Sequence, residues 1–314
     1  MLVPVYDIVN CGPRHRFSAN GKLVHNSQKI NFQNLPSRGK GVNTIKRAVL
    51  APLGYVIIEA DSSQIEARIL AWFAGQHDLV EDFTQKRDVY KKMASHIYGI
   101  DPEEVDKPQR DVGKETILGC GFQMGGDRFQ AQLKMRNIFM ELKKAKHTVK
   151  VYRETYSKIP ELWEDMGEAL IAIMKGQTYK LRNDCVKIVR GGMRLPSGLV
   201  IRYDDLRYEK NPDTGRREMV YTQGRKRTKI YSGKATENMI QGLARCAVGE
   251  QAIRVAKRYK WALTVHDSLV VVAPEAEAEE ARAYTMECMR YVPTWAEGLP
   301  LDCEAGYGRS YGEC

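Results

Sequence analysis

The sequence predicts an α+β protein, and three patterns support that prediction. Apolar runs typical of buried strands occur at 55–60 and 262–272. Several long segments with helical periodicity lie between them, and a strand-rich stretch runs from 187 to 231. Beyond residue 27 there is no internal repeat and no low-complexity linker, so we expect the body of the chain to be one integrated unit.

The elements follow one another in a clear order. The first 26 residues alternate apolar and polar residues around turns at 11–13 and 20–21, which is typical of a small β unit. A polar, Asn- and Gln-rich segment leads to the first buried strand, and the second strand region is followed by a final helix and tail. Helices are predicted at 64–73, 89–98, 107–122, 128–156, 161–175 and 236–259.

Composition and charge restrict the possible partners and compartments. The chain has 49 Lys and Arg against 39 Asp and Glu, a net charge of +10 that favours a polyanionic partner. Its seven cysteines form no pair with zinc-ligand spacing, which argues against a zinc site or a disulfide framework. No apolar run of about 18 residues and no signal peptide occur. We therefore expect a cytoplasmic protein with no membrane partner.

Two aspartates at strand ends suggest a metal site. Asp61 follows the first apolar strand, and Asp267 lies in LTVHDSLVVV with apolar residues on both sides. An ionised carboxylate in such surroundings is costly to desolvate unless it is paired or holds a cation. A single aspartate at a strand end is most simply a helix cap or a turn residue. Two of them fit Mg²⁺, which prefers one or two carboxylates together with phosphates and water.

A basic stripe marks the predicted helix at 107–122. Arg110, Lys114, Leu118 and Phe122 recur every four residues and therefore follow one face. A solvated amphipathic helix with surface ion pairs would also explain the two cations. Two cations, an apolar patch and an aromatic ring on one face suit the triphosphate, sugar and base of an incoming nucleotide.

Three segments together resemble the motifs of family A (DNA polymerase I-like) DNA polymerases. ADSSQIEARILAWFAG at 60–75 resembles motif A, KPQRDVGKETILGCGFQMGG at 107–126 resembles motif B, and TVHDSLVVVAP at 264–274 resembles motif C. The resemblance covers the chain from residue 28 onward. It implies a right-hand palm with an antiparallel sheet, within a polymerase part at 27–314 whose helical fingers occupy about 75–180.

The resemblance also implies the chemistry of the site. Asp61 and Asp267 match the catalytic carboxylates that hold two Mg²⁺ ions, which activate the primer 3′ hydroxyl and stabilise the leaving pyrophosphate. Arg110 and Lys114 match residues that bind the triphosphate of the dNTP, and we count Lys114 as catalytic as well. Phe122 matches an aromatic residue, commonly Tyr, that stacks near the template base.

Some positions depart from the family pattern or allow another role. Leu118 stands where Phe or Tyr is frequent, a variant similar to that of many phage polymerases. Ser268 replaces the acidic residue that usually follows the His-Asp pair, so we assign it no metal ligand. Glu66 matches the glutamate that excludes a ribose 2′ hydroxyl, although an ion pair with Arg68 is the simpler role. Gln64 is assigned to nucleotide binding with Glu66.

Contacts with primer-template DNA are expected from several polar residues. INFQNLPSR at 30–38 resembles the family's stretch that contacts primer and template, and amide side chains suit minor-groove acceptors common to all base pairs. A generic polar loop is the alternative for each residue taken singly. The DNA-contact candidates are Asn31, Gln33, Asn34, Arg38, Gln241 and His266.

The first 26 residues resemble something else, the C-terminal blocks of inteins. A penultimate His25, a terminal Asn26 and a nucleophilic Ser27 are all in place, and His15 matches an upstream histidine of that block. The resemblance implies that Ser27 accepts an upstream acyl group, Asn26 cyclises to a succinimide, and His25 assists by proton transfer. A C-intein at 1–26 that starts from Met1 is typical of a split intein.

These features predict one half of a DNA-directed DNA polymerase, completed by trans-splicing. The expected partner is a separate chain with an N-intein, the thumb and the start of the palm. A truncated or engineered sequence would also explain the short intein segment. Two other functions stay open: an inactive DNA-binding remnant of the fold, and an RNA polymerase relative, against which Glu66 and the Asn/Gln-rich stretch argue.

Overall fold

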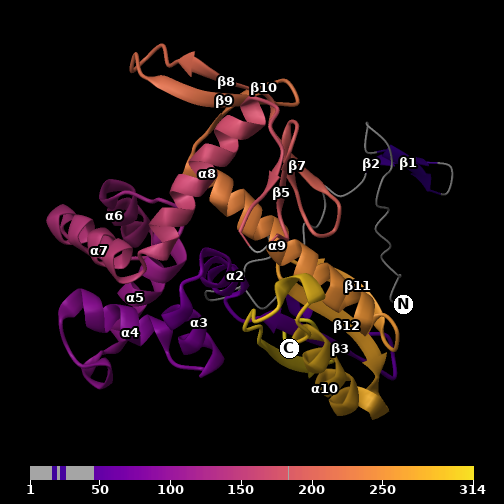
Figure 1. The fold of residues 1–314 in the computed structure, drawn as a ribbon. Helices are drawn as coiled ribbons and strands as arrows, with labels where there is room; N and C mark the ends of the chain where they lie inside the picture. Colours follow the sequence, from indigo (N-terminus) through magenta and orange to yellow (C-terminus); the bar gives the residue numbers. More distant parts are fainter. Residues whose placement is uncertain (1–15, 20–21, 26–45, 183) are drawn as a thin grey trace. The chain divides into compact units, whose positions relative to one another are not determined.

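A computed structural model describes residues 16–19, 22–25, 46–182 and 184–314. Figure 1 shows the order of its helices and strands. Tertiary contacts divide the chain into two compact units, and each is described by itself. Unit 1 comprises Met1–Asp61, Tyr259–Tyr284 and Ala305–Cys314, and unit 2 comprises Ser62–Arg258 and Thr285–Glu304.

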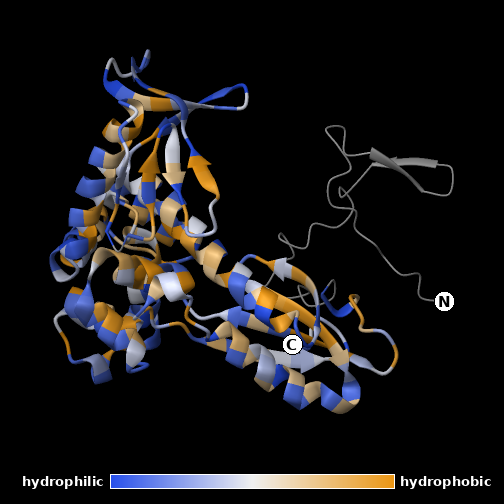
Figure 2. Ribbon diagram, turned by 45° about the vertical axis from the view of Figure 1, so that its right-hand side comes forward, coloured by the Kyte–Doolittle hydropathy of each residue, from blue (hydrophilic) through white to orange (hydrophobic). Residues whose placement is uncertain are grey.

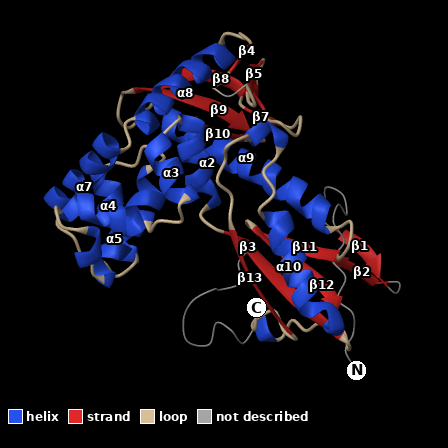
Figure 3. Cartoon of the chain, turned by 60° about the horizontal axis from the view of Figure 1, so that its bottom comes forward, coloured by secondary structure: helices blue, strands red, loops and turns tan. Residues whose placement is uncertain are grey.

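Unit 1 is built on a four-stranded sheet with the order β11-β12-β3-β13 (Figure 3). β12 is antiparallel to both β11 and β3, and the chain passes from β12 through the turn η3 into α10. Ile57, Val270 and Tyr311 form a buried apolar cluster on this sheet, which fixes the strand register through packing. The elements are β3 (Tyr55–Ser62), β11 (Lys260–Val265), β12 (Ser268–Pro274), η3 (Glu275–Glu277), α10 (Ala278–Met289) and β13 (Cys303–Gly308).

Unit 2 is mainly helical. α4 packs closely against α5, α6 against α7, and α8 against α9, the longest helix. Trp163 of α8 donates from Nε1 to Gly121 O over 2.9 Å, which ties α8 to the end of α5. The elements are α2 (Ile65–Ala74), α3 (His77–Thr84), α4 (Val89–Tyr98), η2 (Pro102–Glu104), α5 (Lys107–Cys120), α6 (Gly126–Met135), α7 (Leu142–Thr155), α8 (Lys158–Met174), α9 (Ser232–Val255) and η4 (Thr294–Ala296).

Two antiparallel sheets lie between α8 and α9 in the sequence of unit 2. One has the order β4-β5-β6-β7 and the other β10-β9-β8. The turns of the second sheet are strongly hydrophilic and appear blue in Figure 2. The strands are β4 (Tyr179–Lys180), β5 (Lys187–Val189), β6 (Gly192–Arg194), β7 (Val200–Arg202), β8 (Asp204–Lys210), β9 (Arg217–Gln223) and β10 (Lys226–Ile230).

A short hairpin is described near the N-terminus. β1 (Arg16–Ala19) pairs antiparallel with β2 (Lys22–His25), and Arg16 lies opposite His25. This agrees with the β character predicted for the first 26 residues. The identity of that segment as an intein fragment stays a prediction.

The mixed α/β class, the antiparallel sheets and most helices match the sequence prediction. The single helix predicted at 128–156 is wrong: α6 ends at Met135 and α7 begins at Leu142. Asn137 takes a left-handed conformation, with φ of 60°, which interrupts the helix. The prediction also missed α3, and it assigned as tail the segment that forms β13. Within the described part of the chain, no helix has the length and apolar character needed to cross a membrane.

Candidate functional site

Asp61 lies at the end of β3, held by a serine of the neighbouring strand. The register of β12 and β3 sets Ser268 directly opposite Asp61. Ser268 is buried and donates from Oγ to Asp61 Oδ1 over 2.6 Å, whereas Asp61 is exposed. The hydroxyl therefore orients a carboxylate that solvent or a ligand can reach. We predicted that Ser268 is not a metal ligand, and the structure shows that it contacts the metal-site candidate through this bond.

Asp267 is brought to the same place by a tight turn. β11 ends at Val265 and β12 begins at Ser268, so His266 and Asp267 form a two-residue hairpin loop. His266 is exposed and has a φ of 54°, a left-handed conformation that His, Asn and Asp adopt more often than other residues with a side chain. A two-residue hairpin loop requires a positive φ at one or both of its residues, so the turn that carries Asp267 explains this conformation.

The electrostatics of the two carboxylates favour a cation. Burial and the neighbouring charge of Asp61 together raise the pKa of Asp267 to about 6. A divalent cation between the carboxylates would remove this repulsion, because it favours the ionised form of both. Among the described residues, no group of three or more His, Cys, Asp and Glu side chains could hold a metal ion. Two carboxylates that leave other positions to phosphate and water are a donor set that Mg²⁺ accepts.

The basic stripe lies on α5, as the sequence predicted. Arg110 and Lys114 both lie over the ring of Tyr90, 5.2 Å (Arg110 Cζ) and 5.9 Å (Lys114 Nζ) from its centroid. Arg110 also donates from Nε to Asp88 Oδ2 over 2.7 Å. Leu118 is 41% exposed on the same helix, so an apolar side chain follows the two cations toward the C-terminus of α5.

Asp88 and Tyr90 are site residues that sequence reasoning missed. Asp88 caps α4 by accepting from the amides of Tyr90 and Lys91, each over 3.0 Å, in addition to its bond with Arg110. Burial would raise the pKa of Asp88, but these hydrogen bonds outweigh it and lower the pKa below its usual value. An Asp just before the helical pattern at 89–98 is a visible capping signal, but nothing local links it to Arg110.

The close approach of α4 to α5 depends on a glycine. A Cβ at Gly113 would lie 2.1 Å from the carbonyl oxygen of Tyr90, well inside van der Waals contact. Any larger residue at this position would push α4 away from α5. Gly113 therefore allows Tyr90 to lie beneath the two cations.

Phe122 lies just beyond the helix that was predicted to carry it. α5 ends at Cys120, although Gly121 keeps helical backbone angles, so the predicted end at 122 is two residues too late. The next residue, Gln123, has a φ of 66° and accepts from Ser232 Oγ over 3.0 Å and Gly233 N over 3.1 Å. The side chain of Gln123 thus accepts hydrogen bonds from the first residues of α9. These bonds hold the turn that carries half-buried Phe122.

Gln64 and Glu66 lie where motif A enters α2. Gln64 precedes this helix with a φ of 46°, and its side chain hydrogen-bonds Tyr90 and accepts from Arg68 Nη2 over 3.2 Å. Gln64 is thereby linked to the residues around the basic stripe. Glu66 is half-buried in the first turn of α2, where an acidic residue is favoured by the helix dipole. Arg68 also donates to Pro300 O over 2.7 Å.

The remaining candidates are distributed as follows. Gln241 is exposed on α9, and His25 is the last residue of β2. The other DNA-contact and splicing candidates lie outside the described residues: Asn31, Gln33, Asn34, Arg38, His15, Asn26 and Ser27.

Comparisons with known proteins agree with the fold. The chain is 28% identical over 274 residues to the DNA polymerase of Bacillus phage SP02, covering 83% of this chain and 42% of that protein. It is 28% identical over 294 residues to the thermostable DNA polymerase I of Thermus thermophilus, covering 94% and 31%. A solved structure, the POL domain of Pol1 from M. smegmatis in complex with DNA primer-template and dNTP, superposes with a TM-score of 0.68 at 23% identity, covering 93% of this chain and 46% of that chain.

The chain spans less than half the length of these relatives. Residues 14–313 match the sequence profile of DNA polymerase family A, a match that includes part of the segment predicted to be an intein fragment. Because the matched region covers nearly the whole sequence, the chain belongs to DNA polymerase family A.

Proposed function

We propose that this chain is the C-terminal palm and fingers part of a DNA-directed DNA polymerase that adds dNTPs to a primer 3′ end. The observation that carries the proposal is the pair of carboxylates at the β3–β12 pairing, with Asp61 on β3 oriented by Ser268 of β12 and Asp267 in the turn just before β12. These residues would hold two Mg²⁺ ions, which would supply activation of the primer hydroxyl and charge stabilisation of the leaving pyrophosphate.

Other residues of the chain would bind and select the nucleotide. Arg110 and Lys114 present two cations to the triphosphate from one face of α5, supported below by the Tyr90 ring. Leu118 would contact the sugar and Phe122 the base. Glu66 and Gln64 would act on sugar selection and nucleotide positioning.

Primer-template DNA would be contacted through the polar residues of two segments. The Asn/Gln-rich stretch supplies Asn31, Gln33, Asn34 and Arg38, and α9 supplies Gln241. His266 would contact the primer from the hairpin turn that also carries Asp267.

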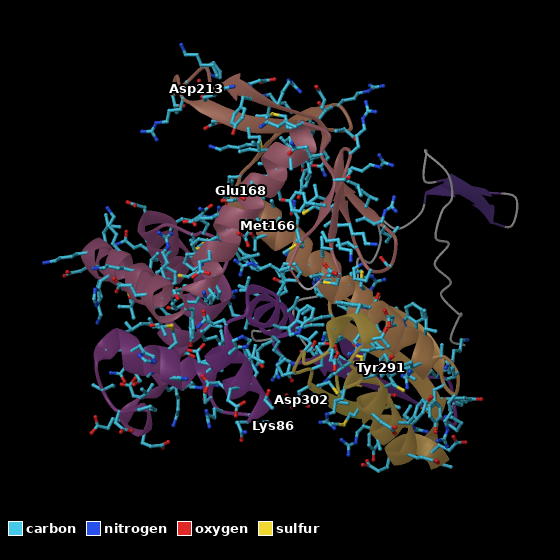
Figure 4. All side chains as sticks on the ribbon, in the orientation of Figure 1. Lys86, Met166, Glu168, Asp213, Tyr291 and Asp302 are labelled. Atoms are coloured by element: carbon cyan, nitrogen blue, oxygen red, sulfur yellow. The ribbon has the colours of Figure 1, made fainter. Side chains whose placement is uncertain are left out.

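The test is primer extension by this chain joined to a matching N-terminal half. Asp61→Ala and Asp267→Ala should each lower Mg²⁺-dependent kcat by on the order of 10³-fold, because both groups act in the transition state. Asp213→Ala is the matched control, since this exposed carboxylate lies at the β8–β9 turn (Figure 4) and should leave kcat unchanged.

Each outcome separates the proposal from a rival. Extension that survives either aspartate change rejects the metal site. An assembled protein that binds primer-template without extending it under any metal supports the inactive remnant. Efficient use of ribonucleotides, unchanged by Glu66→Ala, would indicate an RNA polymerase relative.

The N-terminal segment motivates a second proposal, protein splicing at the Asn26–Ser27 bond. It is motivated by the sequence His25-Asn26-Ser27, with His15 upstream, and by the antiparallel pairing of β1 with β2, which ends at His25. Ser27 Oγ would attack the thioester that joins the upstream acyl group to the first Cys of the N-intein, which forms an ester on Ser27 and releases the Cys thiol. The Asn26 side-chain nitrogen would then attack its own carbonyl carbon, break the bond to Ser27 and leave a succinimide. The freed Ser27 amine would take the acyl group from its own oxygen, which joins the two polypeptides by an amide.

Splicing can be tested separately from polymerisation. The chain is mixed with a second polypeptide that carries a polymerase N-terminal half fused to an N-intein beginning with Cys. Intact-mass analysis should find the ligated product and the freed segment 1–26. Asn26→Ala should block release of that segment, whereas Asn20→Ala, at the predicted turn, should not. Absence of ligation in the unmodified chain rejects the splicing proposal and leaves the polymerase proposal standing.

A further inference from the structure

Most of the net positive charge of the chain lies in one short part of unit 2. Residues 179–231, which span β4 to β10, contain fourteen Lys and Arg against six Asp and Glu, a net charge of +8 compared with +10 for the whole chain. The metal-site candidate lies outside this segment, and the basic stripe of α5 does too. The charge of the two small sheets therefore has no role in the catalytic proposal.

The two sheets differ in how their charged side chains are paired. On the β8–β10 sheet, cations pair with carboxylates of the same sheet: Arg207 and Arg227 with Glu209, and Lys229 with Glu218. Asp213 marks the tip of this sheet in Figure 4. Three of the eight Lys and Arg side chains of residues 204–230 are paired in this way, and five carboxylates leave these residues a net charge of +3, compared with +5 for residues 179–203. The β8–β10 sheet is therefore the weaker candidate for a polyanion site.

On the β4–β7 sheet, in contrast, four cationic side chains lie on one face. Lys180 on β4 lies opposite Lys187 on β5, and Lys187 lies opposite Arg194 on β6. Arg202 on β7 lies opposite Gly192, two residues from Arg194, and so points to the same face. All four cations are exposed. We call this group the cation row.

The opposite face of the same sheet is the buried one. Ile188 and Met193, which pair with each other, are 1% and 0% exposed. α8 packs against β5, and a Cβ at Gly242 of α9 would meet the side chain of Ile201 of β7 at 3.2 Å. Because helices cover this face, the cation row faces outward from unit 2.

The cation row is electrostatically unfavourable in the isolated chain. Like charges directly opposite each other on neighbouring strands are destabilising. Lys180 is compensated by Asp184, with Nζ and Oδ2 2.7 Å apart. Lys187, Arg194 and Arg202 have no carboxylate partner among the residues that the structure describes, so an anion from outside would relieve the repulsion among them.

We propose that the cation row is a binding surface for a single strand of DNA, held through its phosphates without sequence preference. The row runs across the strands, and adjacent strands lie about 4.8 Å apart, so Lys180, Lys187 and Arg194 span about 10 Å in a line. A line of cations complements the linear array of charges on one nucleic-acid strand. The inference rests on the proposed polymerase function, which supplies an unpaired template strand.

Binding of fluorescein-labelled DNA to the full chain, measured by anisotropy without dNTP or Mg²⁺, tests the surface alone. The variant Lys187→Gln/Arg194→Gln/Arg202→Gln should bind a single-stranded 30-mer at least tenfold more weakly at 100 mM salt. Its plot of log affinity against log salt should be less steep by about 2, because each phosphate contact on a single strand contributes about 0.7. A blunt duplex of the same length should lose less affinity than the single strand.

The control removes three charges from another exposed surface of unit 2. Lys143→Gln/Lys146→Gln/Lys150→Gln on α7 changes the net charge equally and should leave single-strand affinity within about twofold. The cation-row variant should melt at the same temperature as the wild type or higher, since it relieves like-charge repulsion. An unchanged affinity and salt dependence, an equal loss in the α7 variant, or an equal loss for duplex DNA would each overturn the inference.

Failure of this proposal and failure of the proposed polymerase function are distinguishable. The anisotropy experiment requires neither metal nor catalysis. If the cation-row variant loses single-strand binding and the assembled protein shows no Mg²⁺-dependent extension, the cation-row proposal stands and the polymerase proposal is rejected. If the assembled protein extends the primer and the cation-row variant binds single strands as the wild type does, the polymerase proposal stands and the cation-row proposal is rejected.

Discussion

Replacing Gly233 with alanine tests how tightly the start of α9 packs against the end of α5. A Cβ at this position would lie 2.4 Å from Gln123 Cβ and 2.5 Å from Phe122 O, and these atoms cannot turn aside as a flexible side-chain tip could. Overpacking of this kind costs about 1–3 kcal/mol of folding free energy. Replacing glycine by alanine in a helix stabilises the helix by about 0.5–1 kcal/mol, which offsets part of that cost. The net loss is about 0–2.5 kcal/mol, centred on about 1 kcal/mol, which should lower Tm by about 2–4 °C at the centre of that range.

Gly249 provides a control within the same helix. No heavy atom lies within 4 Å of a Cβ built there, so Gly249→Ala gains helix propensity without a clash. It should raise the free energy of unfolding by about 0.5–1 kcal/mol and Tm by about 1–4 °C. Both variants are compared by scanning calorimetry of the full chain. A Gly233→Ala variant that melts as high as Gly249→Ala would refute the close packing of α9 on the Phe122 turn.

Three further changes have defined outcomes. Ser268→Ala removes the hydroxyl that donates to Asp61, so the half-saturating Mg²⁺ concentration for primer extension should rise several-fold, and Ser268→Thr should restore most of it. Burial and Asp61 raise the pKa of Asp267 from 3.8 to about 6, so its contribution to the stability of the metal-free chain is present below about pH 4 and lost as pH rises through 6. Asp267→Asn should therefore raise Tm at pH 7.5 in EDTA, with the gain disappearing below pH 4. Asp82 is fully buried and pairs with Lys92, so Asp82→Ala should lower the free energy of unfolding by about 1–3 kcal/mol in urea titrations, and an unchanged midpoint would contradict this role.

Local sequence patterns predict the parts of the site that depend on nearby residues. The strand before Asp61, the turn at 266–267 and the helix that carries Arg110 all have clear periodicity or turn signals, and the structure has each of them. The bond from Ser268 to Asp61 joins residues 207 positions apart, so no local pattern indicates it. Whether these residues bind metal and nucleotide stays a prediction.

The start of α9 illustrates a second limit of local reasoning. The sequence predicts the helix from 236, four residues late, because the residue before the helix, Tyr231, has no side chain that can cap it. The acceptor comes instead from Gln123, at the end of another helix. A capping group supplied from a distant part of the chain leaves no signal at the helix start itself.

The strand order of unit 1 has a consequence for synthesis of the chain. β3 lies between β12 and β13, both of which are made long after it. At about 5–20 residues per second, a ribosome needs about 10–40 s to advance from Asp61 to Ser268, which are 207 residues apart. During that interval the apolar β3 has neither neighbour, and an unpaired apolar strand is a template for aggregation. We therefore expect the yield of folded protein to depend on chaperones that bind the nascent chain, and the carboxylate pair to form only near the end of translation.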